Sequence, residues 1–232
     1  MILLNTALIR KTTLFLAAAM LSVSAMATGF NENQRLANQG DADAQYSLGV
    51  MYKDGDGVRQ DYSKAAQWLE KAASQGNAEA QVLLGVMYDQ GDGVRQDYFK
   101  AVQWFEKSAS QGNADAQFML GLMYDQGDGV RQDYSKATQW LKKSASQKDA
   151  EAQYILGLLY DQGEGVRQDD SKALEWYRKS ANQNHAIAQF NLGLMYANGR
   201  GIRQSLVQAK KWYGDACDNG DQRGCDEYRK LD

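Results

Sequence analysis

The sequence predicts an all-α protein built from five stacked helix-turn-helix repeats of 36 residues. Three observations lead to this prediction. The tryptophans recur every 36 residues, and so do the glutamines of five "AQ" pairs. The word "GDGVRQD", with its variants "GEGVRQD" and "GRGIRQS", keeps the same register. Such repeats cannot bury their apolar faces alone, so neighbouring copies must stack. The five tryptophans are Trp68, Trp104, Trp140, Trp176 and Trp212.

Each repeat begins with a helix, which in the second copy runs from about Ala78 to Tyr88. Asn77 suits the N-cap because its side-chain oxygen can accept a hydrogen bond from a free backbone N–H of the first turn. Glu79 adds negative charge at the positive end of the helix. Gly91 can close the helix in the left-handed conformation. Other copies carry the same cap as Asp41, Asn113 and Asp149, and we interpret His185 as a variant of it rather than a catalytic base.

The second helix of the repeat is predicted from Tyr98 to about Ser110, with Asp97 as its cap. Gly85, in the middle of the first helix, costs about 1 kcal/mol relative to alanine. Its recurrence predicts a close helix contact, which we expect to be with the recurring alanine represented by Ala101. Lys148 stands at a turn position where four other copies have glycine, and we expect a left-handed backbone there.

The segment "DQGDGVRQD" has the glycines and acids of a ligand loop, but its repetition favours a turn. Of the alternate positions Asp89, Gly91 and Gly93, two have no side-chain ligand, whereas a calcium loop needs several. The Lys-Ser or Lys-Thr pair of a phosphate loop is missing. The fifth copy replaces the acid with Arg200 and keeps both glycines. A glycine pair followed by Val94 or its equivalent suits a turn with an apolar anchor.

The N-terminal segment is typical of a signal peptide. A basic pair, Arg10 and Lys11, precedes an apolar stretch and the small-residue site "AMA". We predict a signal peptide over residues 1–27, with cleavage between Ala27 and Thr28. A polar capping helix over 28–43 follows, with Glu32 where the repeat has tryptophan.

Cleavage removes two basic residues and changes the formal net charge from -3 to about -5. A mildly acidic chain with mixed signs offers no surface for nucleic acid or an anionic membrane. The predicted repeats cover 44–222, as 44–79, 80–115, 116–151, 152–187 and 188–222.

The cysteines are Cys217 and Cys225, in the fifth repeat and after it. Two cysteines in an exported chain favour a disulfide, which would join the end of one helix to the start of the next. A metal site needs further ligands, and the one histidine of the sequence, His185, is distant in the chain. Residues 223–232 are predicted to complete a C-terminal capping helix.

These sequence motifs together resemble the Sel-1-like repeat, a relative of the tetratricopeptide repeat. The shared pattern is "A-Q-x-x-L-G-x-x-Y-x-x-G-x-G-V-x-x-D-x-x-K-A-x-x-W", present in five copies. The resemblance implies a right-handed α/α superhelical solenoid that serves as an interaction scaffold. Exported bacterial members are associated with host contact, signalling or envelope processes. Cysteine-rich members have been described as penicillin-binding or β-lactamase-like.

Templates for catalysis are missing from the sequence. It has no HExxH, no G-x-S-x-G, no S-x-x-K and no K-T-G motif. We therefore predict no catalytic residue, no cofactor and no metal, and the resemblance carries no catalytic residue into this chain.

A partner surface is expected where the copies differ, because shared positions form the scaffold. Variable and methionine-rich positions one turn apart on the first helices form a stripe. In tetratricopeptide-like folds these helices line the concave surface, and methionine suits adaptable surfaces. The same stripe could instead be core between repeats. A second candidate is the exposed face of the second helices, where Phe99 and Leu206 replace the more usual serines. The candidate groove residues are Leu83, Met87, Met119, Met123, Ile155, Leu159 and Met195.

The predicted function is that of a non-enzymatic, exported scaffold, periplasmic or secreted, that binds a protein or peptide through its concave surface. We expect a monomer with no stable membrane insertion after cleavage. A penicillin-binding, β-lactamase-like or cell-wall ligand-binding protein is one alternative. A secreted host-interaction factor is another.

Overall fold

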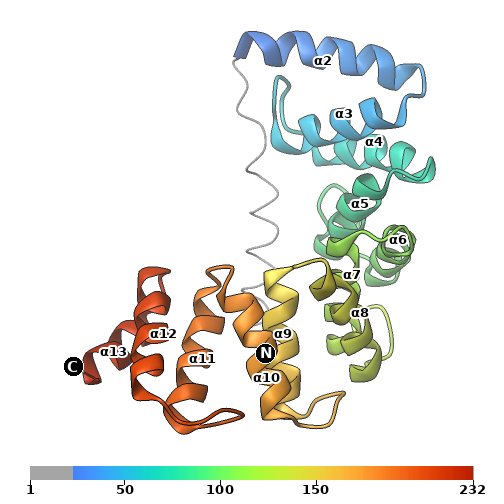
Figure 1. Ribbon diagram of the computed structural model, residues 1–232. Coiled ribbons are helices and arrows are strands. Elements are labelled where there is room, and N and C mark those ends of the chain that lie inside the picture. Colours follow the sequence, from blue (N-terminus) through green and yellow to red (C-terminus); the bar gives the residue numbers. More distant parts are fainter. Residues whose placement is uncertain (1–22, 232) are drawn as a thin grey trace. The chain divides into compact units, whose positions relative to one another are not determined.

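The computed structural model describes residues 23–231, and within this range every regular element is a helix (Figure 1). The chain divides into two compact units, one ending at Asp97 and the other beginning at Tyr98. Most of the predicted signal segment, residues 1–22, lies outside the described residues. The predicted cleavage point after Ala27 falls inside the first described helix.

The first unit holds a capping helix and three helices of the repeats. Each helix packs against the next one in the chain. The capping helix starts before the predicted residue 28 and ends earlier than predicted, so that Asp41 is free to cap the helix that follows. The helices are α2 (Val23–Asn38), α3 (Ala42–Asp54), α4 (Tyr62–Ser74) and α5 (Ala78–Gln90).

The second unit continues the pattern with eight helices, again with consecutive helices in contact. Its last helix is the predicted C-terminal cap. The helices are α6 (Tyr98–Ser110), α7 (Ala114–Gln126), α8 (Tyr134–Ser146), α9 (Ala150–Gln162), α10 (Asp170–Ala181), α11 (Ala186–Asn198), α12 (Leu206–Asp218) and α13 (Gln222–Lys230). The all-helical repeat fold predicted from the sequence is confirmed.

The predicted caps of the first helices are present. Asn77 accepts a hydrogen bond from the Ala80 N–H at 2.8 Å, and Gly91 closes the same helix with φ 81°. His185 uses Nδ1 to accept from the Ala188 N–H at 3.1 Å. This confirms His185 as a cap, and the acceptor role of Nδ1 places its proton on Nε2, 3.0 Å from Glu151.

The recurring mid-helix glycine makes the close contact that the sequence predicts, but with a different partner. A Cβ added at Gly157 would lie 2.4 Å from Cδ1 of Tyr177, and one at Gly121 would lie 2.6 Å from Cγ of Leu141. Tyr177 and Leu141 are both fully buried. The nearest partner is not the expected alanine but a large side chain one turn further along the second helix, which fills the space that the glycine leaves. At Gly49 the expected Ala65 is also close, through its carbonyl oxygen at 3.3 Å.

The recurring glutamine connects consecutive turns. It is buried in all five copies. In the fourth copy, Gln153 Nε2 donates to the Ala145 carbonyl at 3.0 Å. Its Oε1 accepts from Gln183 Nε2 at 2.9 Å. One side-chain amide thus donates to a free carbonyl at the end of the preceding helix and accepts a hydrogen bond from a glutamine of the next turn. Both bonds satisfy buried polar groups, which explains why the glutamine recurs in every copy.

Lys148 has the left-handed backbone that the sequence predicts, with φ 69°. The matching glycines have φ between 90° and 98°. A Cβ added at any of them would have no heavy atom within 4 Å, so the conformation alone sets the cost of a side chain there. These glycines are Gly40, Gly76, Gly112 and Gly220.

Lys148→Gly is therefore expected to stabilise the protein by about 1 kcal/mol, because glycine adopts this conformation without the steric cost of a Cβ. Thermal unfolding followed by circular dichroism would measure it, with a rise of about 2–4 °C. Lys148→Ala is the control: it removes the charge but keeps the Cβ and should not reproduce the gain. An unchanged or lower melting temperature for the glycine variant would contradict the interpretation.

Candidate functional site

The stripe of seven predicted groove residues is buried. Each of these side chains is at most 9% exposed. Met119 and Met123 in α7, Ile155 and Leu159 in α9, and Met195 in α11 therefore belong to the core of the second unit. Leu83 and Met87 in α5 are buried in the same way. The alternative that the sequence left open, a core between helices, agrees with this burial.

The repeated G-x-G segment is a turn that fits against the preceding repeat. A Cβ added at Gly165 would lie 2.3 Å from the carbonyl oxygen of Tyr134, at the start of α8. The second glycine of the pair thus lets two backbones approach closely, and its φ is 66°. Within residues 23–231, no group of three acidic, histidine or cysteine side chains is placed to hold a metal ion. The valine after the pair, such as Val166, is half-buried.

The arginine of the fifth copy has a structural role. Arg200 forms ion pairs with Asp161 at the end of α9 and with Asp170 at the start of α10, the latter at 2.5 Å. The hydrogen bonds that the guanidinium donates to Asp170 and Asp161 raise its pKa above the ordinary value. Two changes therefore occur together in the sequence. Arg200 replaces the acid of the loop, and its ion-pair partner Asp170 stands where the first three copies have tyrosine.

Cys217 and Cys225 form the predicted disulfide, with a Cα–Cα distance of 4.6 Å. Cys225 occupies the position of the recurring glutamine, and Cys217 that of the residue whose carbonyl the glutamine binds. The disulfide therefore replaces, in the last turn, the hydrogen bond that closes the other turns. It joins α12 to α13.

The start of the second helices exposes large apolar side chains. Phe99 on α6 is 61% exposed, and Leu206 and Val207 on α12 are 53% and 78% exposed. The register differs from the sequence interpretation in one detail. Val207, rather than Leu206, lies 36 residues after Ser171 and replaces the serine, while Leu206 follows the position of Asp170.

The tryptophan of the repeat carries a lysine over its ring in four copies. The ammonium of the lysine three residues later lies 3.8–3.9 Å from the ring centroid. This is a cation–π contact within one helix turn. The pairs are Trp68 with Lys71, Trp104 with Lys107, Trp140 with Lys143, and Trp176 with Lys179.

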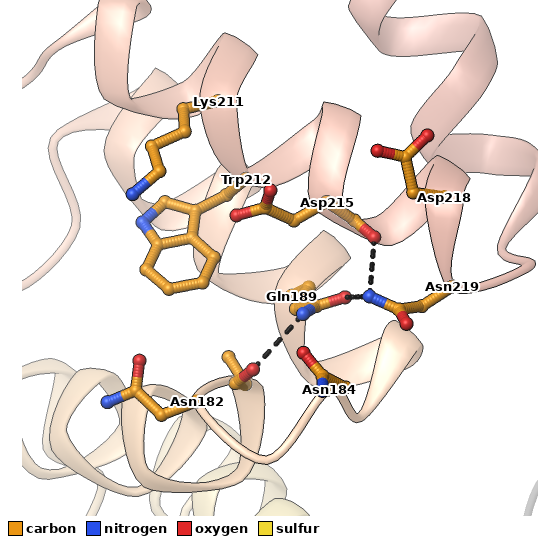
Figure 2. A pocket seen from close by; sticks show the side chains of 9 residues that line it. Asn182, Asn184, Gln189, Lys211, Trp212, Asp215, Asp218 and Asn219 are labelled. Atoms are coloured by element: carbon orange, nitrogen blue, oxygen red, sulfur yellow. Dashed lines mark hydrogen bonds between the residues drawn. The ribbon is translucent and has the colours of Figure 1, made fainter.

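The fifth tryptophan borders a polar pocket of about 320 Å³ (Figure 2). Trp212 has Asp215 at the position of the lysine. Lys211 approaches from the other side, with its ammonium 5.4 Å from the ring centroid. Figure 2 shows the Asp215 carboxylate directed toward the tryptophan. Sequence reasoning missed this pocket, and the change from W-x-x-K to W-x-x-D is the signal that could have found it.

Hydrogen bonds hold the wall of this pocket. Asn219 Nδ2 donates to Gln189 Oε1 at 3.0 Å and to the Asp215 carbonyl at 2.9 Å. Gln189 in turn donates to the Ala181 carbonyl at 3.1 Å, as Figure 2 shows. The buried indole Nε1 of Trp212 has no hydrogen-bond partner among the described residues. The pocket is therefore fixed on one side by the hydrogen bonds of Asn219 and Gln189.

These features define a helical-repeat scaffold. Its helix pairs stack on one another and share a recurring glutamine, a close-packed glycine and a capped turn. The Sel1 repeat model matches residues 42–77, 78–113, 114–149, 150–185 and 186–221. The chain belongs to the Sel1 repeat family. No match is found among curated protein sequences.

Two solved structures are similar to this protein over most of its chain. A protective antigen of uropathogenic Escherichia coli with an SLR fold is 38% identical, with a TM-score of 0.82, over 83% of this chain and 41% of its own. A Sel1 repeat protein from Oxalobacter formigenes is 34% identical, with a TM-score of 0.79, over 86% of this chain and 58% of its own. This chain therefore spans about half the length of these relatives. No helix within residues 23–231 is long and apolar enough to cross a membrane.

Proposed function

We propose that this protein is an exported scaffold that binds a protein or peptide partner and catalyses no reaction. Sel1 repeat scaffolds typically mediate protein interactions, which supports the general role. The N-terminal basic and apolar segment and the Cys217–Cys225 disulfide support export. Because the methionine-rich stripe is buried, the proposed contact surface is the exposed start of the second helices.

The observation that carries this proposal is the exposure of Phe99, Leu206 and Val207. The corresponding positions in other copies hold serine, tyrosine or aspartate, so the fold does not require an aliphatic or phenyl side chain there. Large apolar side chains are the residues whose burial contributes most to protein contacts. Their exposure at positions where other copies have polar residues supports a role in contact with another molecule.

A pull-down from the envelope fraction, with crosslinking, would test this surface. Phe99→Ser and the double variant Leu206→Ser, Val207→Ser are expected to reduce partner recovery at least about tenfold, since each removes exposed apolar contact area. Their melting temperatures should match that of the original protein. The control is Ser135→Ala, an exposed serine at the same register position as Phe99. Partner recovery unchanged in both apolar variants would refute the proposed surface.

A second candidate function is contact with host molecules. The relative from uropathogenic Escherichia coli is a protective antigen, and this supports exposure to the host. Cell fractionation distinguishes the two candidates: protein in the culture medium or on the cell surface favours host contact, and protein retained in the periplasm favours an envelope partner. The mature N-terminus is expected at Thr28 in either case.

The penicillin-binding alternative rests on family association alone. Ser180 has a structural role, because it is fully buried and its hydroxyl donates to the Ala150 carbonyl at 2.7 Å. A fluorescent penicillin is therefore expected to leave no covalent label on the purified protein. Covalent labelling that follows saturation kinetics would favour this alternative over the scaffold.

A further inference from the structure

We propose that the pocket at Trp212 binds a lysine side chain of the partner peptide. This inference rests on the proposed peptide-binding function and adds a specific site to it. The four other repeats act as internal references, because each shows what the tryptophan ring binds at this position: a lysine ammonium 3.8–3.9 Å from the centroid. In the fifth repeat the chain no longer supplies that lysine.

Three substitutions distinguish the fifth repeat around its tryptophan. The lysine becomes Asp215, the residue that is serine in three other copies becomes Asp218, and the recurring glutamine of the turn becomes the shorter Asn219. The first two add negative charge and the third shortens a side chain. All three line the pocket. In the other repeats the chain's own lysine covers the tryptophan ring. In the fifth repeat the three substitutions leave an open pocket with two carboxylates beside the ring.

The charges of the pocket favour a cation. Neither Asp215 nor Asp218 forms an ion pair with another described residue, whereas Lys211 supplies one positive charge at the edge. A visiting ammonium would contact the Trp212 face and Asp215 at once, combining a cation–π contact with a charge-assisted hydrogen bond. The volume of about 320 Å³ lies at the lower end of ligand sites and suits a single side chain.

A peptide fits better than a free amine because amide side chains line the pocket around the tryptophan. Amide groups can both donate to and accept from the backbone of a bound peptide. Asn182 and Asn184, on the turn opposite Trp212, line the same pocket and offer further amide groups to a peptide backbone.

Lys211 is the competitor within the chain. Three other copies have glutamine at its position, so its charge is particular to the repeat that lacks the usual lysine. Its ammonium lies 5.4 Å from the Trp212 centroid, further than the 3.8–3.9 Å of the internal pairs. It therefore covers the ring only loosely, and a ligand lysine can displace it.

The experiment follows the tryptophan indole N–H resonances of the ¹⁵N-labelled protein by NMR. The probe is a capped glycine pentapeptide with a central lysine; the comparison probes are the same peptide with Nε-acetyl-lysine, and butylammonium. The lysine peptide is expected to shift the Trp212 resonance saturably in the millimolar range, as one cation–π and ion-pair contact allows. The acetylated peptide should bind at least about tenfold more weakly, because it lacks the charge.

Asp215→Lys is the decisive variant, because it restores the lysine of the other four repeats and should fold as they do. It is expected to abolish the shift. Glu106→Lys is the matched control: it makes the same change of charge at an exposed position where the third repeat has Lys142, and it should bind as the original protein does. Lys211→Gln, which restores the glutamine of other copies, should bind several-fold more tightly.

Several outcomes would overturn the inference. The inference fails if the original protein shows no saturable shift, or if the acetylated peptide binds equally well. It also fails if Asp215→Lys binds unchanged, or if Glu106→Lys loses binding to the same extent. Binding of butylammonium without binding of the peptide would overturn the peptide as the source of the ammonium. If these results occur while partner recovery still depends on Phe99, Leu206 and Val207, the lysine site fails and the scaffold function stands.

Discussion

Gly165→Ala is expected to destabilise the second unit by about 2–4 kcal/mol. The new Cβ would lie 2.3 Å from the carbonyl oxygen and 2.5 Å from the carbonyl carbon of Tyr134. A backbone carbonyl cannot rotate away as a side chain can, so α8 and the turn must separate. The left-handed φ of 66° adds about 1 kcal/mol. Urea unfolding followed by circular dichroism would measure the loss, which includes a typical overpacking cost of about 1–3 kcal/mol.

The matched control for this prediction is Gly112→Ala. Gly112 has φ 90° and would gain a Cβ with no heavy atom within 4 Å. Its cost is therefore conformational only, about 1 kcal/mol. The difference between the two variants isolates the contact between repeats. Equal effects would show that the G-x-G turn is needed for its conformation alone and not for close approach.

Removal of the disulfide is expected to destabilise the C-terminal end by about 2–3 kcal/mol. The two cysteines are separated by 8 residues, and a loop of this size constrains the unfolded chain somewhat less than the 15-residue loop to which about 3 kcal/mol is assigned. Cys217→Ser with Cys225→Ser should lower the melting temperature and increase hydrogen exchange in α13. End repeats contact one neighbour only, so the effect should concentrate there.

A second double variant, taken from the residues of the other repeats, is expected to recover part of this lost stability. Cys217→Ala with Cys225→Gln reproduces the residues of the other copies, in which the glutamine Nε2 donates to the carbonyl at the alanine. One buried hydrogen bond should restore about 1 kcal/mol relative to the serine pair. If the two double variants are equally stable, the disulfide and the glutamine are not equivalent closures of the turn.

The helices and their ends could be predicted because they depend on local chemistry. Asn77 caps its helix through a hydrogen bond three residues away, and Gly91 closes it through its own backbone freedom. Lys148 could be assigned a left-handed φ because glycine stands there in four other copies. Five copies in one sequence separate such requirements from chance, since a local requirement must be met in each.

The burial of the stripe could not be predicted in the same way, because burial depends on neighbouring helices. Met123 and Leu159 lie one turn after the variable positions of their helices, as groove residues would. Both are 2–3% exposed. Variation between large apolar residues is also what a core tolerates when the volume is roughly kept, and periodicity cannot distinguish the two.

The sequence alone determined the family, the period, the two helices of each repeat and the positions of their caps, because these follow from short-range patterns repeated five times. Only the tertiary structure decided that the methionine-rich stripe is core, that Gly165 meets the previous repeat, and that Trp212 borders an open pocket. These three depend on which residues meet across helices, and that is set by packing between repeats rather than within them.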